Sequence, residues 1–200
     1  MTEQTTDDTA PVVGEGDDSA HPQRHTLRNW LIVIVVALVV AVGVRAYVFE
    51  SFFVPSGSMI PTIEIGDHMI VDKLSYHLHS VGFGNIIVFH KPADDHTSAN
   101  IHYLVKRVIG LPGQTIWFHD GQVYINGKPI AEPFLPKGVK TYPLSAASES
   151  PIHIPKNEYY VLGDNRGDSA DSRVFGPISR SLIVGRVILI YWPLSQWHYF

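Results

Sequence analysis

The sequence contains no cysteine. This absence excludes thiol catalysis, disulfide bonds and zinc sites that depend on thiolates. It is compatible with a location on either side of a membrane, because only an abundance of cysteines would indicate an oxidising compartment.

The sequence also lacks a large excess of either positive or negative charge. The chain has 15 Lys and Arg against 19 Asp and Glu, a net charge of −4, and no cluster of basic residues. A surface that binds nucleic acid needs such a cluster to meet the phosphates, so we expect no nucleic-acid partner.

Known hydrolase motifs are missing as well. Among the 11 histidines, none belongs to a catalytic-triad motif, and the sequence contains neither Gly-x-Ser-x-Gly nor His-Glu-x-x-His. His77 and His79 have a spacing that suits two ligands on one strand face, but no third ligand accompanies them. We therefore expect no metal and no other cofactor.

Long apolar runs are scarce, and one stands out. Trp30 to Val44 is a stretch of 15 residues without a charge. A membrane span needs about 20 residues. Arg45 near the end of a helix can extend its charge to the interface, so Leu31 to Phe49 reaches the required length. A cleaved signal peptide is the competing interpretation, but no small-x-small site follows directly. We predict a transmembrane helix over residues 29–49.

The residues before this run are polar. Residues 1–26 contain six acidic side chains and almost no large apolar ones, which is typical of disorder. Arg24 and Arg28 supply the positive charge on this side. The positive-inside rule then favours a disordered cytoplasmic tail over residues 1–28 and an exported domain over residues 50–200 in a single-pass protein of the cell membrane, although Arg45 weakens the asymmetry.

The region after the predicted span shows no helical periodicity longer than two turns. Instead it contains short β-rich runs: 68–72, 85–89, 103–109, 115–118, 122–125 and 158–162. Asp120-Gly121 between two of these runs predicts a tight hairpin. Leu182 to Ile190 carries Arg186 at its centre and therefore predicts a closing strand rather than a second span. The fold class is mainly β, with twisted antiparallel sheets.

A serine in an unusual setting is the first candidate for chemistry. Ser58 lies 14 residues beyond Val44, directly before a methionine, where a strand has little reason to carry a small exposed hydroxyl. A serine hydroxyl is a weak nucleophile unless a base lies within hydrogen-bond reach.

Lys106 is the candidate base, because it lies inside an otherwise apolar strand. Strand alternation places Lys106 and Arg107 on opposite faces. Burial favours the neutral form of an amine, whereas a guanidinium stays charged. We therefore predict Lys106 inward and neutral, with Arg107 outward. Alternatively, both side chains are solvated on a hairpin. A serine and a desolvated lysine next to a membrane suggest a hydrolase acting on membrane-delivered peptide.

Four segments together resemble the bacterial type I signal peptidases, the serine–lysine endopeptidases that cleave signal peptides from exported proteins. They occur in that family's order and extend from the predicted span almost to the end of the chain: Pro55–Thr62, Gly66–Lys73, Tyr103–Gly113 and Gly163–Arg173 with Phe175-Gly176-Pro177.

The resemblance implies a role for several residues. Ser58 would be the nucleophile and Lys106 the general base. Ser56 and the backbone N–H of Ser58 would form the oxyanion hole, and Ser169 would hydrogen-bond Lys106 and orient it. Structural support would come from an ion pair between Asp171 and Arg173, and from Asp164.

The resemblance also implies shallow apolar pockets that admit alanine-sized side chains, and hence cleavage after small-x-small sites. The lining is expected to comprise Phe52, Val54, Pro55, Met59, Ile63, Leu104 and Val105. The partners would be signal peptides of preproteins emerging from the secretion machinery, and the lipid bilayer. Gly84-Asn85 and Gly113-Gln114 stand where the family often has glycine–aspartate, which leaves the turn geometry open there.

Three rivals differ in class. Self-cleaving repressors also use serine and lysine, but they need a nucleic-acid-binding domain and an Ala-Gly site, neither of which this sequence has. A non-catalytic anchored domain that binds exported peptides would need no pairing of Ser58 with Lys106. Sortase-type transpeptidation is excluded by the lack of cysteine.

Overall fold

The computed structural model describes residues 23–95 and 101–200. The chain divides into two compact units, residues 1–41 and 42–200. Within the described residues one helix, α1 (Gln23–Tyr47), contains a window long and apolar enough to cross a membrane, Thr26–Val44, with a mean hydropathy of 2.5. A signal sequence would pass the same test of length and composition.

The bounds of α1 differ from the prediction of residues 29–49. Residues 23–28, assigned to the disordered tail, are helical, because polar helix formers extend the apolar core of a helix without any break in the backbone. The predicted disorder of residues 1–22 lies outside the described residues. At the other end, Phe49 begins a strand instead of closing the helix.

The remainder of the chain is mainly β, as predicted. An eight-stranded sheet has the order β1-β2-β11-β3-β4-β9-β10, with β12 paired to β11, and the strands in it are antiparallel. Its strands are β1 (Phe49–Phe53), β2 (His68–Asp72), β3 (Ile86–His90), β4 (Tyr103–Gly110), β9 (Glu158–Leu162), β10 (Ile178–Ser179), β11 (Ile183–Trp192) and β12 (His198–Tyr199).

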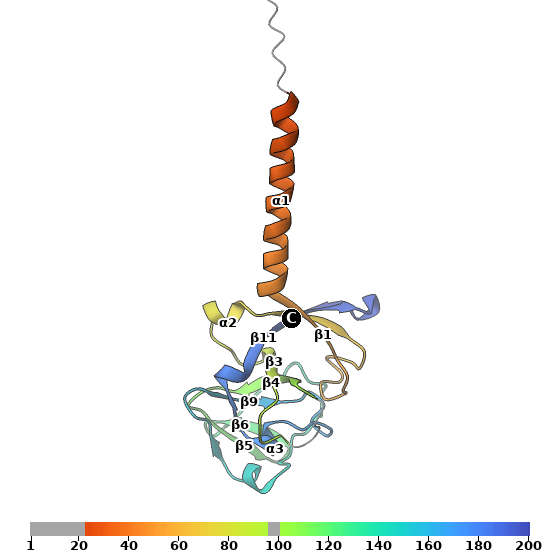
Figure 1. Ribbon diagram of the computed structural model, residues 1–200. Coiled ribbons are helices and arrows are strands. Elements are labelled where there is room, and N and C mark those ends of the chain that lie inside the picture. Colours follow the sequence, from red (N-terminus) through yellow and green to blue (C-terminus); the bar gives the residue numbers. More distant parts are fainter. Residues whose placement is uncertain (1–22, 96–100) are drawn as a thin grey trace, which may run out of the picture. The chain divides into compact units, whose positions relative to one another are not determined.

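A smaller sheet has the order β7-β6-β5-β8. Its strands are β5 (Thr115–His119), β6 (Gln122–Ile125), β7 (Lys128–Pro129) and β8 (Ile152–His153). Short helical turns complete the unit: α2 (Ser75–Leu78), η1 (Ala146–Ser148), α3 (Ser172–Phe175), η2 (Arg180–Leu182) and η3 (Leu194–Gln196). Figure 1 shows β5 and β6 at the opposite end of this unit from β1.

The predicted hairpin is confirmed. Phe118 pairs with Val123 and His119 with Gln122, so Asp120 and Gly121 alone form the turn. Both have positive φ, 50° and 75°, which is the conformation that favours an Asp-Gly pair in a tight hairpin. The six predicted strands and the closing strand are present with small shifts at their ends. The edge strand β1 was missed, because Glu50 and Ser51 interrupt its apolar pattern.

Amide side chains, those of Asn85 and Gln114, accept the turn hydrogen bonds at the two positions where the family often has aspartate. Asn85 Oδ1 accepts hydrogen bonds from the Gly82 N–H, at 3.0 Å, and from the Tyr76 hydroxyl, at 3.2 Å. Gln114 Oε1 accepts from the Leu111 N–H at 2.8 Å. An amide oxygen can cap a turn as a carboxylate does, so both turns close without the charge.

Three apolar clusters form the core. One lies around β2 and β11 and includes Met59 and Ile63, which follow Ser58 in the chain. A second lies around β3, β9 and α3. The third, which includes Ile109 and Ile116, joins the large sheet to the small one. As a result β4, between β3 and β9, is covered on both faces over its second half.

Candidate active site

Ser58 lies at the start of a series of tight turns that follows β1. The backbone N–H of Ile60 donates to Gly57 O at 3.2 Å, and those of Thr62 and Ile63 donate to Met59 O at 2.9 and 3.0 Å. Met59 and Ile63 are buried, 1% and 0% exposed, because side chains four apart share one face of such a turn. The turn is thereby fixed to the core, while Ser58 stays half-buried at its edge.

Lys106 lies on β4 opposite Ile87 of β3, and it is 2% exposed. Its Nζ lies 2.7 Å from Ser58 Oγ, which is hydrogen-bond distance. Burial lowers the pKa of Lys106 from the ordinary 10.5 to about 8, although the nearby Asp171 carboxylate acts in the opposite direction. About a tenth of this amine is therefore neutral at pH 7, compared with about one part in three thousand for an ordinary lysine, and able to accept a proton.

Arg107 contradicts the prediction that it points into solvent. It is 5% exposed and forms a bidentate pair with Asp164, from Nε to Oδ1 at 2.8 Å and from Nη2 to Oδ2 at 2.6 Å. Its guanidinium also lies over the Phe134 ring, 4.1 Å from the centroid. Strand alternation correctly places Lys106 and Arg107 on opposite faces of β4. It does not reveal that the face carrying Arg107 is also covered by other residues. The continuous run of apolar residues after Arg107 could have indicated a strand that is buried on both faces.

Asp164 connects the strand of the lysine to the turn of the serine. The Thr62 hydroxyl donates to Asp164 Oδ2 at 2.5 Å, and the same carboxylate binds Arg107. Thr62 belongs to the turn that begins at Ser58, and Arg107 follows Lys106. One carboxylate therefore joins both sides of the Ser58–Lys106 contact.

The neighbouring Asn165 holds the backbone of the serine. Its N–H donates to Ser58 O and its Nδ2 donates to Gly57 O, each at 3.1 Å. Gly163 lies so close that a Cβ there would be 2.5 Å from Ser58 O and 2.2 Å from Ser169 Oγ. Glycine is required at this position because a side chain would displace one of these groups.

The ion pair between Asp171 and Arg173 is present and fully buried. Arg173 Nε and Nη2 donate to the two carboxylate oxygens at 2.9 and 2.8 Å. Asp171 also accepts from the backbone N–H groups of Gly163, at 3.0 Å, and Arg173, at 3.1 Å. These bonds close the segment 163–173 into a compact loop, because they satisfy both charges without solvent.

Ser169 does not make the predicted hydrogen bond to Lys106. It is 7% exposed, and among the described residues its Oγ has no hydrogen-bond partner. The side chain packs instead against Gly163. The sequence motif predicted that Ser169 lies in this loop, but it could not predict the rotamer of a side chain in so small a space.

An apolar pocket of about 50 Å³ borders Ser58 and Lys106. It is lined by six of the seven predicted side chains, Phe52, Val54, Pro55, Met59, Leu104 and Val105, and also by Ser56. Ile63 does not line the pocket, because its side chain points into the core, where it is 0% exposed. Sequence reasoning missed Phe53, Met69, Ile101 and Tyr103. Met69 is found only from strand register, since it pairs with Phe52 across β1 and β2.

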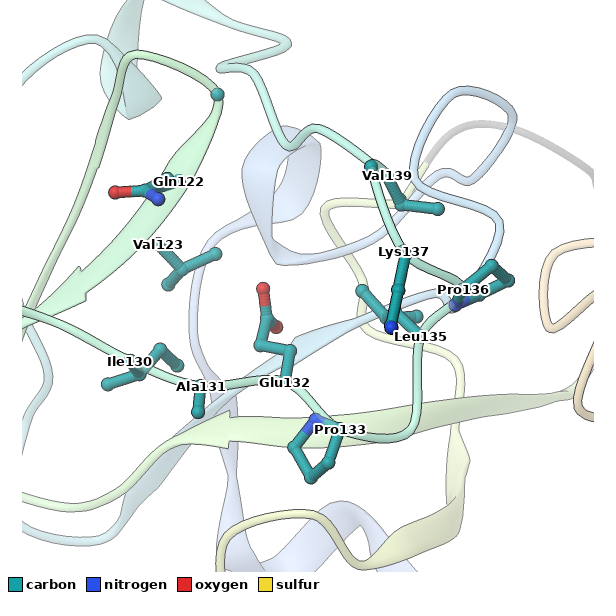
Figure 2. Close-up of a pocket in the computed structure, with 12 residues that line it drawn as sticks. Gln122, Val123, Ile130, Ala131, Glu132, Pro133, Leu135, Pro136, Lys137 and Val139 are labelled. Atoms are coloured by element: carbon teal, nitrogen blue, oxygen red, sulfur yellow. The ribbon is translucent and has the colours of Figure 1, made fainter.

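A larger cavity, of about 500 Å³, lies away from these residues. It is formed by the start of β6 and the connection after β7, with Gln122 and Val123 on one side and residues 130–139 on the other (Figure 2). None of the predicted site residues lines it.

Comparison with known proteins shows which protein family the chain belongs to. Residues 27–192 match the family described as signal peptidase, peptidase S26. A probable signal peptidase I-2 of Synechocystis is 38% identical over 82% of this chain and 72% of its own. A signal peptidase I of Leptolyngbya laminosa is 39% identical over 85% of this chain and 82% of its own.

A solved structure is also similar. A signal peptidase I of Enterococcus faecalis is 32% identical, with a TM-score of 0.44 over 54% of this chain and 97% of its own. The family match and the two relatives each extend over most of the chain, which confirms the resemblance drawn from the four segments. The chain thus belongs to the signal peptidases of peptidase family S26 and is a serine endopeptidase that processes signal peptides.

Proposed function

We propose that this peptidase cleaves preproteins after small-x-small sites with Ser58 as nucleophile and Lys106 as general base. The observation that carries the proposal is the 2.7 Å distance between Ser58 Oγ and the buried Lys106 Nζ. Chains of this family need a base for the serine, and a buried amine of lowered pKa supplies one without histidine or metal.

The reaction runs in two halves. In the first, neutral Lys106 accepts the proton of the Ser58 hydroxyl as Oγ attacks the scissile carbonyl carbon. The tetrahedral intermediate collapses to an ester on Ser58, and Lys106 gives its proton to the departing amine of the mature protein. In the second, Lys106 takes a proton from water as the water oxygen attacks the ester carbonyl. Lys106 then returns this proton to Ser58 Oγ as the ester bond breaks, and the signal peptide leaves as a carboxylic acid that loses its own proton to solvent.

The oxyanion of both intermediates would be held by the Ser58 backbone N–H and the Ser56 hydroxyl. Ser56 borders the same pocket as Ser58 and Lys106, which supports this role. Asn165 fixes the carbonyls of Gly57 and Ser58, so the peptide groups around the nucleophile are held before substrate arrives. Donors held in advance stabilise a developing charge more than donors that must reorganise.

The preference for small substrate side chains would follow from the small volume of the pocket and from the buried residues that form its floor. Val54, Met59 and Met69 are 3%, 1% and 0% exposed, so the floor is packed against the core and cannot recede. The volume of about 50 Å³ leaves room for a methyl-sized group beside Ser58. Larger side chains would have to displace core residues, which costs free energy in a close-packed interior.

A single membrane anchor would present substrate and enzyme to each other. The apolar window of α1, Thr26–Val44, supports a span, and Arg24 before this window and Arg28 in its first turn support a cytoplasmic N-terminus. The domain of residues 50–200 would then be extracytoplasmic and meet signal peptides leaving the secretion machinery. Exposed aromatic side chains at Trp192, Trp197 and Tyr199 are of the type that contacts the lipid interface.

The substrate proposal is tested with the full chain in phospholipid vesicles and a preprotein carrying Ala-x-Ala before the cut. We expect cleavage after the second alanine. Replacing that alanine with phenylalanine should lower kcat/KM by at least about 100-fold, since the pocket cannot accept the ring. A phenylalanine substrate cleaved as fast as the alanine substrate would refute the proposed pocket, and no cleavage of either would refute the activity.

The pH dependence tests the base. Only neutral Lys106 can accept the serine proton, and its pKa is about 8. We therefore expect kcat/KM to rise about tenfold per pH unit below this value and to level off above it. The measurement is kcat/KM from pH 6 to about 10 with an uncharged peptide substrate. A profile that stays flat from acid to alkaline pH would contradict a lysine base.

A further inference from the structure

The connection between β7 and η1 returns to the hairpin from which it starts. We call residues 130–142 the brace. At its beginning the Ile130 N–H donates to Val123 O at 3.0 Å, and near its end the Thr141 N–H donates to Gly121 O at 2.9 Å. Both ends are therefore fixed to β6 and its turn, and the brace lines one side of the open cavity of about 500 Å³. Figure 2 shows the Glu132 carboxylate directed into the space between Val123 and Val139.

Glu132 binds an arginine of the loop that holds the serine. Arg166 Nη2 donates to Glu132 Oε1 at 2.5 Å, and Nη1 donates to Oε2 at 3.0 Å. Nη1 also donates to the Thr141 hydroxyl at 2.5 Å. The side chain of Arg166 is 1% exposed and that of Glu132 13%. Because the buried guanidinium donates two parallel hydrogen bonds to one carboxylate, the orientation of the Arg166 side chain is fixed as well as its position.

Arg166 in turn fixes the backbone beside the serine. Its Nε donates to Gly163 O at 3.0 Å. Gly163 packs against Ser58 O, and Asn165, which directly precedes Arg166, donates to the carbonyls of both Gly57 and Ser58. A chain of direct contacts therefore leads from the Glu132 carboxylate through Arg166 to the backbone of Ser58.

A second arginine joins the same two segments. Arg173 Nη1 donates to Arg166 O at 2.9 Å and to Tyr142 O at 3.1 Å. Hydrogen bonds therefore join the brace to the loop of residues 163–173 through Glu132, Thr141 and Tyr142. Of these, Glu132 alone contributes a charged side chain, and its partner Arg166 would otherwise be a buried cation without a counter-ion at that end.

We propose that Glu132 is a positioning residue for cleavage: through Arg166 it holds the loop that aligns Ser58 with Lys106. The inference rests on the proposed function of these two residues. It assigns a role in the reaction to a connection that belongs to the smaller sheet and contributes no side chain to the pocket beside Ser58.

The test is Glu132→Gln in the full chain, which keeps the shape but presents an N–H₂ group to the guanidinium. We expect kcat to fall by roughly 10- to 100-fold, because a displacement of about 1 Å at a reacting group has effects of that size. KM should change less than twofold, since the pocket residues are untouched, and the pKa seen in kcat/KM should stay near 8, since the burial of Lys106 is untouched.

Two further variants separate positioning from folding. Glu149→Gln is the control, because Glu149 is an exposed carboxylate outside the brace, and it should leave kcat unchanged. In an Arg166→Ala background, Glu132→Gln should cause no additional fall in kcat, because Glu132 acts through Arg166. Should Glu132→Gln fail to fold, Thr141→Val, which removes one acceptor of Arg166, is expected to lower kcat in the same way with a smaller effect.

The outcomes are distinct. Unchanged kcat per folded molecule in Glu132→Gln, with only a lower melting temperature, would overturn the positioning role. An additional fall in the Arg166→Ala background would overturn the route through Arg166. Full activity of Ser58→Ala would instead overturn the proposed function itself, whatever Glu132→Gln does.

Discussion

Replacing Ser58 with alanine is expected to lower kcat by at least about 10⁴-fold, because the substitution removes the atom that forms the ester, which is the hydroxyl oxygen in contact with Lys106 Nζ. The fold should remain intact, since Ser58 is half-buried and Met59 and Ile63 still anchor its turn. The measurement is single-turnover cleavage of the Ala-x-Ala preprotein in vesicles, together with thermal unfolding.

The matched control is Ser80→Ala, an exposed serine in a loop, for which we expect unchanged kcat. A serine-directed acylating reagent gives a second readout: it should label the parent enzyme and the Ser80→Ala variant but not Ser58→Ala. Residual cleavage of Ser58→Ala within about 10-fold of the parent would mean that another nucleophile does the chemistry.

Replacing Lys106 with methionine should have an effect on kcat of similar size, at least about 10³-fold, while making the protein more stable at neutral pH. Methionine has nearly the volume of the apolar part of the lysine side chain and has no donor group that needs a hydrogen-bond partner, so the pocket should keep its shape. Lys106→Met removes the amine that lies 2.7 Å from Ser58 Oγ, and with it the group placed to accept the Ser58 proton.

The stability gain depends on pH in a defined direction. Burial lowers the pKa of Lys106 in the folded chain to about 8 against an ordinary 10.5. Between these values the unfolded chain binds more protons than the folded chain, so the free energy of unfolding of the parent increases as pH rises through this window. The cost of the buried amine is fully present below about pH 8 and absent above about 10.5. Lys106→Met removes this cost.

Thermal unfolding checks this reasoning. At pH 7 the melting temperature of Lys106→Met should exceed that of the parent, and the difference should shrink as pH rises above about 8. Lys156→Met, at an exposed lysine, should change neither activity nor this pH dependence. A Lys106→Met variant that is less stable than the parent at pH 7 would show that the amine is not buried at a cost.

Strand positions were predictable because they depend on local pattern. Asp120 and Gly121 specify a tight turn, and alternation around them fixes which residues face the core. The approach of Ser58 to Lys106 is different, since 48 residues separate them. The apolar surroundings of Lys106 made it the candidate base for Ser58, and the family resemblance supported their pairing, but no local pattern encodes which strands become neighbours.

The wrong predictions have a common physical cause. Arg107 was assigned to solvent because alternation says which face a residue shares, not what covers that face. Ile63 was assigned to the pocket through the family resemblance, which did not show that its side chain points into the core. Ser169 was expected to bind Lys106, but its direction depends on a close contact with Gly163. Each of these errors concerns tertiary packing, which a single sequence does not specify locally.

The carboxylate of Asp164 has a consequence for how the enzyme fluctuates. Because it accepts from Thr62 and Arg107 at once, opening the loop of residues 163–173 releases both walls of the reacting pair in a single event. Segments joined in this way open together as a cooperative unit. We therefore expect the opening of this loop to remove the alignment of Ser58 with Lys106 in one step, so that the turnover of a population depends on the fraction of molecules in which the loop is closed.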